Sequence, residues 1–535
     1  MPGVSLVETL SGVLDAFSSF DATLWAVLVV GVVAGLLVGV LPGLTFVMGV
    51  LLLLPLTYGM GAESGVALML AVYVAGTYGG AITSILLHVP GEPNHVPLLW
   101  DGHTMARQGR AAEALGWAAV AALAGGLVSW LVLAFVSEPI SRLALNLGQP
   151  EYFLVVLIGL TSVLVLTDDS VRRSLMALVV GMLIATVGVD DVYGSVRFSF
   201  GSDLLRDGID YLPVMIGVYA VTHVLVRFGA RFAADEEAQP TRVRTVVPGP
   251  GAIWRRRGSL TRGVTLGSLI GTVPGAGATV ASFLAYGVER QVSRDRHTLG
   301  RGNPDGVIAP QAASTATVGG ALVPMLVLGI PGSAATAVIL GALLLHDVQP
   351  GPQIFQTQPE LVYTIIAALL VSVLLMFVLG LLTAGPMVRL LRVPEAYVAV
   401  LIVLFAYIGA FAIRNTLSDV WIMAGFAVLG LLLERYGFPL APLVLGAILG
   451  PLAERYLTTT LIASDNDPSV FLTRPLSAAL LALWVGLVVL LSVRALRASR
   501  ASRGGAPDHP GQTPGAEPGA NPGTDPQHHE ENTRA

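Results

Sequence analysis

The chain has 535 residues, of which 54% are hydrophobic and 12% are charged, and its formal net charge is −5. Soluble domains are about one quarter charged, and a mean hydropathy of +0.74 leaves too little polar surface for a soluble protein of this length. The composition therefore excludes a soluble multidomain enzyme and predicts a polytopic α-helical membrane protein.

Cysteine is absent, and all 30 basic residues are arginine. Without cysteine the chain has no disulfide, no thiolate nucleophile and no Cys-ligated metal site. Without lysine it has no nucleotide-binding P-loop, and no basic domain indicates a nucleic-acid partner. We therefore expect no cofactor, no resident metal, no nucleic acid and no ATP hydrolysis by this chain.

Apolar runs of helix length recur along the chain, separated by short polar stretches. A full membrane crossing needs about 20 residues, so several runs are marginal. We expect about 11 full spans and two re-entrant hairpins, within a range of about 10–14 segments. The predicted segments are 24–41, 45–58, 66–89, 112–136, 151–167, 174–190, 211–228, 264–286, 306–345, 361–384, 396–413, 419–436, 440–457 and 478–494.

Arginine placement predicts the orientation, because cytoplasmic loops of membrane proteins are rich in basic residues. Residues 1–106 contain no Lys or Arg, which predicts an N-terminus outside the cell. Arg107 and Arg110 predict a cytoplasmic loop after the segment 66–89, and the arginines from Arg494 onward predict a cytoplasmic C-terminus. Four arginines on predicted outer loops weaken this assignment: Arg142, Arg197, Arg206 and Arg474. The segment 264–286 has arginines on both sides, which favours a hairpin that enters and returns on the cytoplasmic side. The segment 24–60 lacks them, so its hairpin would open outside.

Two short motifs recur in the same order, which indicates an internal repeat. Gly35 to Leu44 resembles Gly267 to Ala276 at an offset of 232 residues, and 79–91 resembles 319–332 at an offset of 240 to 241. An odd number of crossings in the first half would invert the second half, as in many secondary transporters. The predicted parts are a first transmembrane repeat (1–228), an Arg-rich cytoplasmic linker (229–262), a second repeat (263–497) and a disordered Pro/Gly-rich cytoplasmic tail (498–535).

Pro-Gly pairs interrupt apolar runs at four places: Pro42-Gly43, Pro90-Gly91, Pro274-Gly275 and Pro331-Gly332. Proline breaks a helix, and the amides of the next helix start must then face protein, water or a ligand, since lipid cannot satisfy them. Helix starts favour anions. A single pair is more simply a kink or tight helix packing, whereas two symmetric pairs favour a binding site. The candidate substrate-binding residues are these eight together with Thr45, Asn94, Gly277, Thr279 and Ser333.

Charge is absent from the segments that carry these breaks. Residues 24–60, 64–87, 264–286 and 306–345 contain no Asp, Glu, Lys, Arg or His. An anionic substrate would therefore be held by backbone amides and hydroxyl groups, and main-chain carbonyls would coordinate a cation such as Na⁺. A membrane-embedded enzyme acting on a lipid-linked substrate is the alternative from another class, and it would recruit Asp101, His103, Arg107 and Asp305. An anion channel is a third possibility.

Several stretches make the chain similar to the large permease subunit of the tripartite tricarboxylate transporter family. They are GVLPGL (39–44), LLLPLTYGM (52–60), YGGAITSILLHVPGEP (78–93), DGHTMARQGRAAEALG (101–116), IGTVPGAGATVASFLAYGVER (270–290) and GGALVPMLVLGIPGSAATAVILGALLLHDVQPGP (319–352). They occur in the family's order, and the resemblance covers about residues 20–495.

The resemblance implies a secondary uptake system of the bacterial inner membrane. Its other parts would be a small membrane subunit and an extracytoplasmic solute-binding protein. The substrates would be di- and tricarboxylates such as citrate, imported by alternating access with a Na⁺ or H⁺ gradient.

One stretch departs from the family's pattern. Where the family commonly has Ala-Pro-Glu-Ala-Ala-Asn-Asn-Ala, this chain has 309–316 with Gln311, Ser314 and Thr315 in place of the acid and the two amides. These three residues are the candidates for coupling-ion binding, and their departure puts the ion choice in doubt. The first-half stretch near Asn94 and His95 is also less typical of the family.

Overall fold

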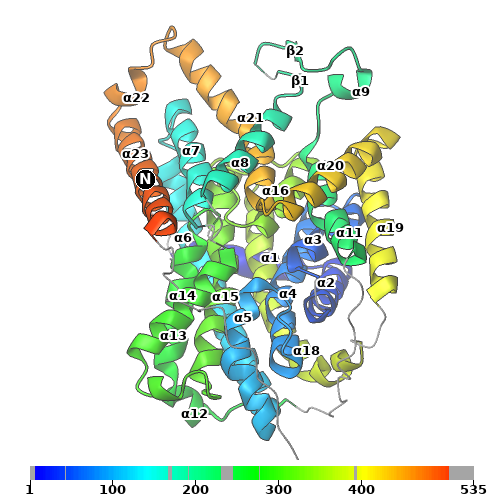
Figure 1. The fold of residues 1–535 in the computed structure, drawn as a ribbon, viewed down its shortest axis with the longest axis vertical. Helices are drawn as coiled ribbons and strands as arrows, with labels where there is room; N and C mark the ends of the chain where they lie inside the picture. The colour runs from blue at the N-terminus through cyan, green and yellow to red at the C-terminus, as the bar shows by residue number, and fades with distance from the viewer. Residues whose placement is uncertain are drawn as a thin grey trace, which may run out of the picture.

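The computed structural model describes residues 6–41, 44–166, 171–190, 192–229, 245–275, 277–390 and 395–504. Within them the fold is helical apart from one antiparallel pair of two-residue strands, β1 (Gly188–Val189) and β2 (Val196–Arg197). The chain turns back between these strands at Gly194, which has a φ of 66°. The prediction of an all-α membrane protein is thus confirmed in its main feature, with this small sheet added at one end (Figure 1).

Nine helices in the described part of the chain are long and apolar enough to cross a membrane. The sequence predicts about 11 spans, and its segments 151–167 and 174–190 form the shorter helices α7 (Gln149–Leu166) and α8 (Val171–Ala185), which are not among the nine. The nine are α2 (Ala22–Val40), α4 (Ala62–Leu87), α6 (Ala111–Ala144), α15 (Asp305–Leu328), α18 (Pro359–Leu390), α19 (Glu395–Arg414), α20 (Leu417–Arg435), α21 (Leu440–Ala463) and α23 (Pro475–Gly504).

Shorter helices complete the fold. They are α1 (Leu6–Ser18), α3 (Phe46–Thr57), α5 (Val96–Leu98), α9 (Asp203–Arg206), α10 (Tyr211–Met215), α11 (Thr222–Gly229), α12 (Pro250–Arg255), α13 (Arg257–Gly271), α14 (Gly277–Val292), α16 (Ala334–Leu345), α17 (Ile354–Thr357) and α22 (Val470–Thr473). The 3₁₀ turns are η1 (Pro93–His95) and η5 (Arg296–Thr298), and the π-helical turns are η2 (Leu99–His103), η3 (Ala106–Arg110) and η4 (Ile216–Val221).

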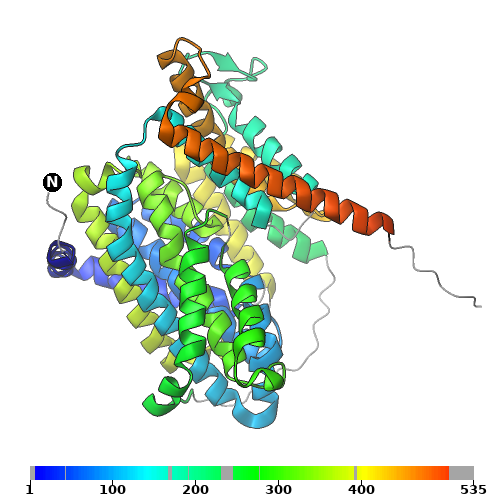
Figure 2. The same ribbon diagram turned by 90° about the vertical axis from the view of Figure 1, so that its left-hand side faces the viewer.

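Two helices form the centre of the molecule. The apolar window of α4 is 100% buried and that of α15 is 94% buried, whereas the window of α23 is 11% buried. A helix that is apolar on all sides is stable only inside a protein or a membrane. α4 packs against α2, α3 and α18, and α15 packs against α6, α13 and α14. Figure 2 shows α23 as a long peripheral helix.

Glycine residues bring the central helices into backbone contact with their neighbours. A Cβ built on Gly79 of α4 would lie 2.9 Å from Cα of Gly39 in α2, and one built on Gly320 of α15 would lie 2.9 Å from Cα of Gly271 in α13. No side chain fits at that distance, so close helix packing requires glycine here. Gly39 and Gly271 are 232 residues apart, which is the offset of the repeated motif.

The ends of the central helices are also alike. α4 ends at His88 with φ 59°, and α15 ends at Gly329 with φ 69°, so both chains leave the helix through a left-handed residue. These ends precede the predicted breaks at 90–91 and 331–332. The breaks at 42–43 and 274–275 fall between α2 and α3 and between α13 and α14, as the Pro-Gly pairs predict.

Helices also extend into two stretches that the sequence sets apart. α13 begins at Arg257, within the predicted linker 229–262, and α23 continues to Gly504, within the predicted tail 498–535. Residues 230–244 and 505–535 lie outside the described part of the chain.

Candidate functional site

In the first half of the chain, the segments that follow the breaks at 42–43 and 90–91 meet at the start of α3. Thr45 caps this helix by accepting a hydrogen bond from Met48 N (3.2 Å). The carboxylate of Glu92, which follows the other break, accepts a hydrogen bond from Phe46 N and is 6% exposed. Two amides at this helix start are therefore already bonded within the protein. The sequence does not predict Glu92 as part of this site, because Glu92 lies outside the charge-free segments.

The remaining residues of this first pair follow the prediction in part. Pro42 and Gly43 lie outside the described residues. Pro90 is half-buried and Gly91 is buried, and a Cβ on Gly91 would lie 2.8 Å from the Gly39 carbonyl oxygen. Only glycine allows the segment after α4 to lie this close to α2.

The second pair of breaks is joined by a backbone hydrogen bond. Gly275 N donates to Gly332 O at 3.0 Å, and Ser162 of α7 donates its hydroxyl to Pro274 O at 2.7 Å. Gly275 has a φ of 79°, in the left-handed region that favours glycine. Pro331 is buried beside Gly332, so the two breaks form one compact backbone junction.

Helix starts follow both breaks of the second pair. Ser333 caps α16 by accepting from Thr336 N (3.3 Å), and the Thr336 hydroxyl accepts from Ser333 N (2.8 Å). Gly277 and Thr279 lie in the first turn of α14 and are half-buried. The start of α16, like that of α3, is therefore capped by the protein's own side chains.

Residues that follow the breaks bond to the central helix of the other half. Asn94 donates from Nδ2 to Ser314 Oγ of α15 (2.7 Å), and Ser282 of α14 donates to the carbonyl oxygen of Asn94 (2.6 Å). In the opposite sense, the hydroxyls of Tyr73 in α4 and Ser333 lie 3.2 Å apart. The segments that follow the breaks at 90–91 and 331–332 are thereby each bonded to the central helix of the other half.

A main-chain carbonyl in α4 joins two further side chains. Thr77 O accepts from Gln311 Nε2 at 3.0 Å and lies 2.8 Å from His95 Nε2. Because a carbonyl only accepts, His95 carries its proton on Nε2 and its Nδ1 is an acceptor. Gln311 also donates to Thr315 Oγ1 (3.2 Å).

Two acceptor atoms in this group have no hydrogen-bond partner. They are Gln311 Oε1 and His95 Nδ1, and both residues are fully buried. Buried polar groups are nearly always bonded, so these two unpaired acceptors are suited to a bound proton, cation or water. Gln311, Ser314 and Thr315, predicted as coupling-ion candidates, all belong to this buried group.

Comparison with known proteins decides the family. Residues 25–445 match the family described as "Tripartite tricarboxylate transporter TctA family". The chain belongs to this family. The matched region begins in α2 and ends in α21, so it includes all four breaks.

Curated relatives of this TctA-family chain come from Agrobacterium vitis. An "Uncharacterized 52.8 kDa protein in TAR-I ttuC' 3'region" is 36% identical over 471 residues, which cover 88% of this chain and 93% of the relative. An "Uncharacterized protein in TAR-II ttuC' 3'region" is 38% identical over 234 residues, which cover 44% of this chain and 97% of the relative. No solved structure matches the chain.

The TctA family supplies the large membrane subunit of tripartite tricarboxylate transporters. The chain is therefore a multi-pass component of a bacterial transporter and not an enzyme. The two stretches predicted to depart from the family's pattern contact each other in this TctA-family chain: Asn94 bonds to Ser314, and His95 and Gln311 both bond to Thr77 O. A single sequence contains no signal for that contact, because the stretches are more than 200 residues apart.

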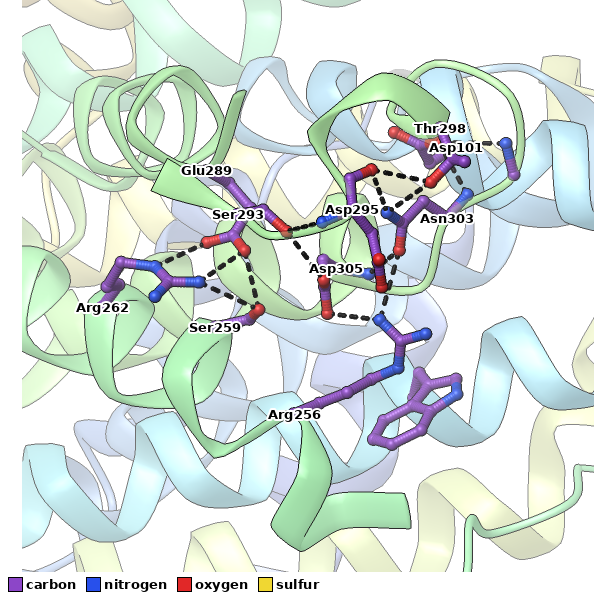
Figure 3. A network of polar contacts seen from close by, with 12 residues as sticks. Asp101, Arg256, Ser259, Arg262, Glu289, Ser293, Asp295, Thr298, Asn303 and Asp305 are labelled. Atoms are coloured by element: carbon purple, nitrogen blue, oxygen red, sulfur yellow. Dashed lines mark hydrogen bonds and ion pairs between the residues drawn. The ribbon is translucent and has the colours of Figure 1, made fainter. Parts of the chain in front are cut away.

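A network of charged and polar residues of this TctA-family chain includes Arg256 and Arg262 (Figure 3). These arginines follow α12, which lies at one end of the molecule (Figure 1). Arg256 pairs with Asp305 (2.6 Å), and Arg262 pairs with the fully buried Glu289 (2.6 Å). The hydrogen bonds with Glu289 raise the pKa of Arg262, so its guanidinium stays charged. These ion pairs tie α12 and α13 to α14 and to the start of α15.

Asp101 is the centre of a second set of bonds in this region. Its carboxylate accepts hydrogen bonds from the amides of Gly300 (2.8 Å), Gly302 (3.0 Å) and Asn303 (2.8 Å) and from the Tyr286 hydroxyl (2.9 Å). It is fully buried. This residue and Asp305, considered for an enzyme, thus hold the loop before α15 in place.

The other two residues considered for an enzyme are not in that network. His103 Nδ1 lies 3.1 Å from Ile85 O and its ring is 4.5 Å from that of His88, while Arg107 is exposed. The four residues therefore do not converge on one reaction centre.

Replacement of Asp101 by alanine is expected to destabilise the protein by about 2 kcal/mol, because the buried amides of Gly302 and Asn303 and the buried Tyr286 hydroxyl lose their acceptor. The unfolding temperature of the purified protein in detergent measures this effect. The exposed Asp15, replaced in the same way, is the control and is expected to change the temperature little. An unchanged unfolding temperature in the Asp101→Ala variant would contradict the anchoring role.

Proposed function

We propose that this chain is the permease subunit of a binding-protein-dependent secondary transporter that imports di- and tricarboxylates such as citrate. Uptake is driven by a Na⁺ or H⁺ gradient through alternating access. The subunit acts with a small membrane subunit and an extracytoplasmic solute-binding protein. Its N-terminus faces outside and its C-terminus faces the cytoplasm.

The observation that carries this proposal is that each half of the chain is bonded to the central helix of the other half. Asn94 reaches α15 from the break of the first half, and Ser333 reaches α4 from the break of the second half. A centre built from both halves changes when one half moves against the other, which is what alternating access requires. The substrate carboxylates would be bound here by backbone amides and hydroxyls, since the segments 24–60, 64–87, 264–286 and 306–345 contain no cationic residues.

Matching glycine contacts in the two halves support two inverted repeats, 1–228 and 263–497. Gly39 against Gly79 in the first half corresponds to Gly271 against Gly320 in the second. We further propose that the segments around the breaks at 42–43 and 274–275 are re-entrant hairpins that open on opposite sides of the membrane. The Arg-rich end with α12 would then be cytoplasmic, and the end with β1 and β2 would face outside.

The coupling ion is proposed to bind beside Gln311, Ser314 and Thr315. The free oxygen of Gln311 and the hydroxyls next to it are ligands that suit Na⁺, and His95 Nδ1 is a site that suits a proton. The buried carboxylate of Glu92 is a second group whose negative charge would stabilise a bound cation.

Uptake by proteoliposomes tests the proposal. Both membrane subunits are reconstituted, the binding protein is added, and the accumulation of labelled citrate and related acids is measured with an imposed Na⁺ or H⁺ gradient. We expect accumulation of at least one carboxylate that stops when the gradient is collapsed. Flux that ignores both ion gradients would indicate a channel, and no uptake across a broad panel of carboxylates would refute the proposal.

A further inference from the structure

A cavity of about 700 Å³ opens beside the ion pairs at the end with α12. It lies between the start of α13, the end of α14 and the first turns of α6. Its charged lining consists of five arginines and three acids: Arg255, Arg256, Arg257, Arg262, Arg294, Glu113, Asp295 and Asp305. The cavity thus has a surplus of positive charge.

Two of the three acids are already bonded to other groups of the protein, which leaves Asp295 to offset the remaining arginines. Asp305 is bonded to Arg256 and to the Ser293 hydroxyl, and Glu113 is bonded to Arg110, which is not part of the lining. Among the described residues, neither Arg255 nor Arg294 forms an ion pair, and both are exposed. Two guanidinium groups are therefore free to bind an anion.

Two of the arginines that line the cavity are held by carboxylates. Two carboxylates hold Arg262 and Arg256 in place: Glu289 is fully buried, and the side chain of Asp305 is 8% exposed. The Arg256 guanidinium also lies 5.8 Å from the Trp117 ring centroid. Fixed donors reduce the entropy lost when a ligand binds, and arginine is the preferred partner of phosphate groups.

Three apolar side chains are part of the lining of this cationic cavity. Trp117, Ala252 and Val292 line it, and Val292 is 58% exposed. Trp254 precedes the lining arginines, is 67% exposed, and has the Arg257 guanidinium 4.5 Å above its ring. Exposed tryptophan beside arginine is typical of the membrane–water interface. A soluble anion would contact only the arginines, whereas an amphiphile would contact both the arginines and the apolar side chains.

We propose that this cavity binds the phosphate group of an anionic membrane phospholipid, with the acyl chains on its apolar side chains. Basic pockets between membrane helices bind such head groups in other proteins. A lipid here would join α12 and α13 to α14 and α6. The inference stands apart from carboxylate transport, because lipid binding requires no substrate, gradient or partner subunit.

Native mass spectrometry of the full-length protein tests this inference. The detergent-purified protein is titrated with phosphatidylglycerol and, separately, with phosphatidylcholine. We expect the Arg255→Gln/Arg294→Gln variant to bind phosphatidylglycerol about tenfold more weakly than the natural protein, while its binding of phosphatidylcholine is unchanged. The Arg290→Gln/Arg296→Gln variant is the matched control, since both residues are exposed and outside the cavity.

Two outcomes would overturn the inference. Equal phosphatidylglycerol binding by the cavity variant and the control would remove the cavity from lipid binding. Full displacement of the lipid by millimolar inorganic phosphate would show that a free anion, and not a lipid, is the ligand. A monodisperse gel-filtration profile of both variants establishes that the change of charge has not unfolded them.

Discussion

Replacing Gly275 with valine is expected to lower the initial rate of carboxylate uptake about tenfold or more. Gly275 has a φ of 79°, and a side chain at such a φ costs about 1–3 kcal/mol of strain. About 1.4 kcal/mol corresponds to a tenfold change in rate. The strained break would move away from Gly332, to which Gly275 donates its hydrogen bond (3.0 Å). The junction of the second pair of breaks would then be lost.

The measurement is uptake by proteoliposomes, normalised to the amount of inserted protein. The same substitution at Gly287 of α14 is the control, because a Cβ built there meets nothing within 4 Å. We expect Gly287→Val to transport at nearly the natural rate and both variants to insert into the membrane normally. Natural uptake in Gly275→Val would exclude this break from the transport site.

Gln311→Glu is expected to make uptake fall as the pH rises. The Gln311 amide donates to Thr77 O and Thr315 Oγ1, and the residue is fully buried. A glutamic acid can donate to the Thr77 carbonyl only when it is protonated. As an anion it would face that carbonyl without a counter-charge, which is costly in a buried site. The favourable form is therefore present at low pH and is lost at high pH.

The ratio of variant to natural uptake is measured from about pH 5.5 to 8, which removes any pH dependence that both proteins share. We expect the ratio to fall by about tenfold across this range. The protonated fraction of a carboxyl group falls about tenfold when the pH is about one unit above its pKa. Gln353→Glu is the control, because Gln353 is exposed. A ratio that is constant with pH would show that residue 311 does not bond within the transport centre. Recovery at high pH upon addition of Na⁺ would instead indicate that the new carboxylate binds the ion.

Much of the fold follows from local properties of the chain. The apolar runs predict the helices because an apolar surface must be buried in protein or lipid. The four breaks were predictable because each joins a proline, which lacks the N–H of a helix, to a flexible glycine, and α2, α3, α13 and α14 end or begin beside their Pro-Gly pairs. Proline alone does not end a helix here, since Pro310 and Pro324 lie inside α15. β1 and β2 were not predicted, because two-residue strands leave almost no pattern.

The candidate site was predictable only in part. Pro90, Asn94, Pro274 and Ser333 were identified from their types and positions, and the structure brings their segments together. What those residues contact was not predictable. Glu92 bonds to the start of α3 and Ser333 caps α16, so these helix starts are less available to an anion than the sequence suggests.

The sequence by itself determined the membrane class, the family, the positions of the breaks and the absence of charge around them, because each depends on residue type and local spacing. The tertiary structure alone decided that Asn94 bonds to Ser314, that His95 and Gln311 share Thr77 O, and that arginines surplus to their acids surround one cavity. Those contacts join residues far apart in the chain. They depend on how the helices pack, and the glycine contacts of α4 with α2 and of α15 with α13 set that packing.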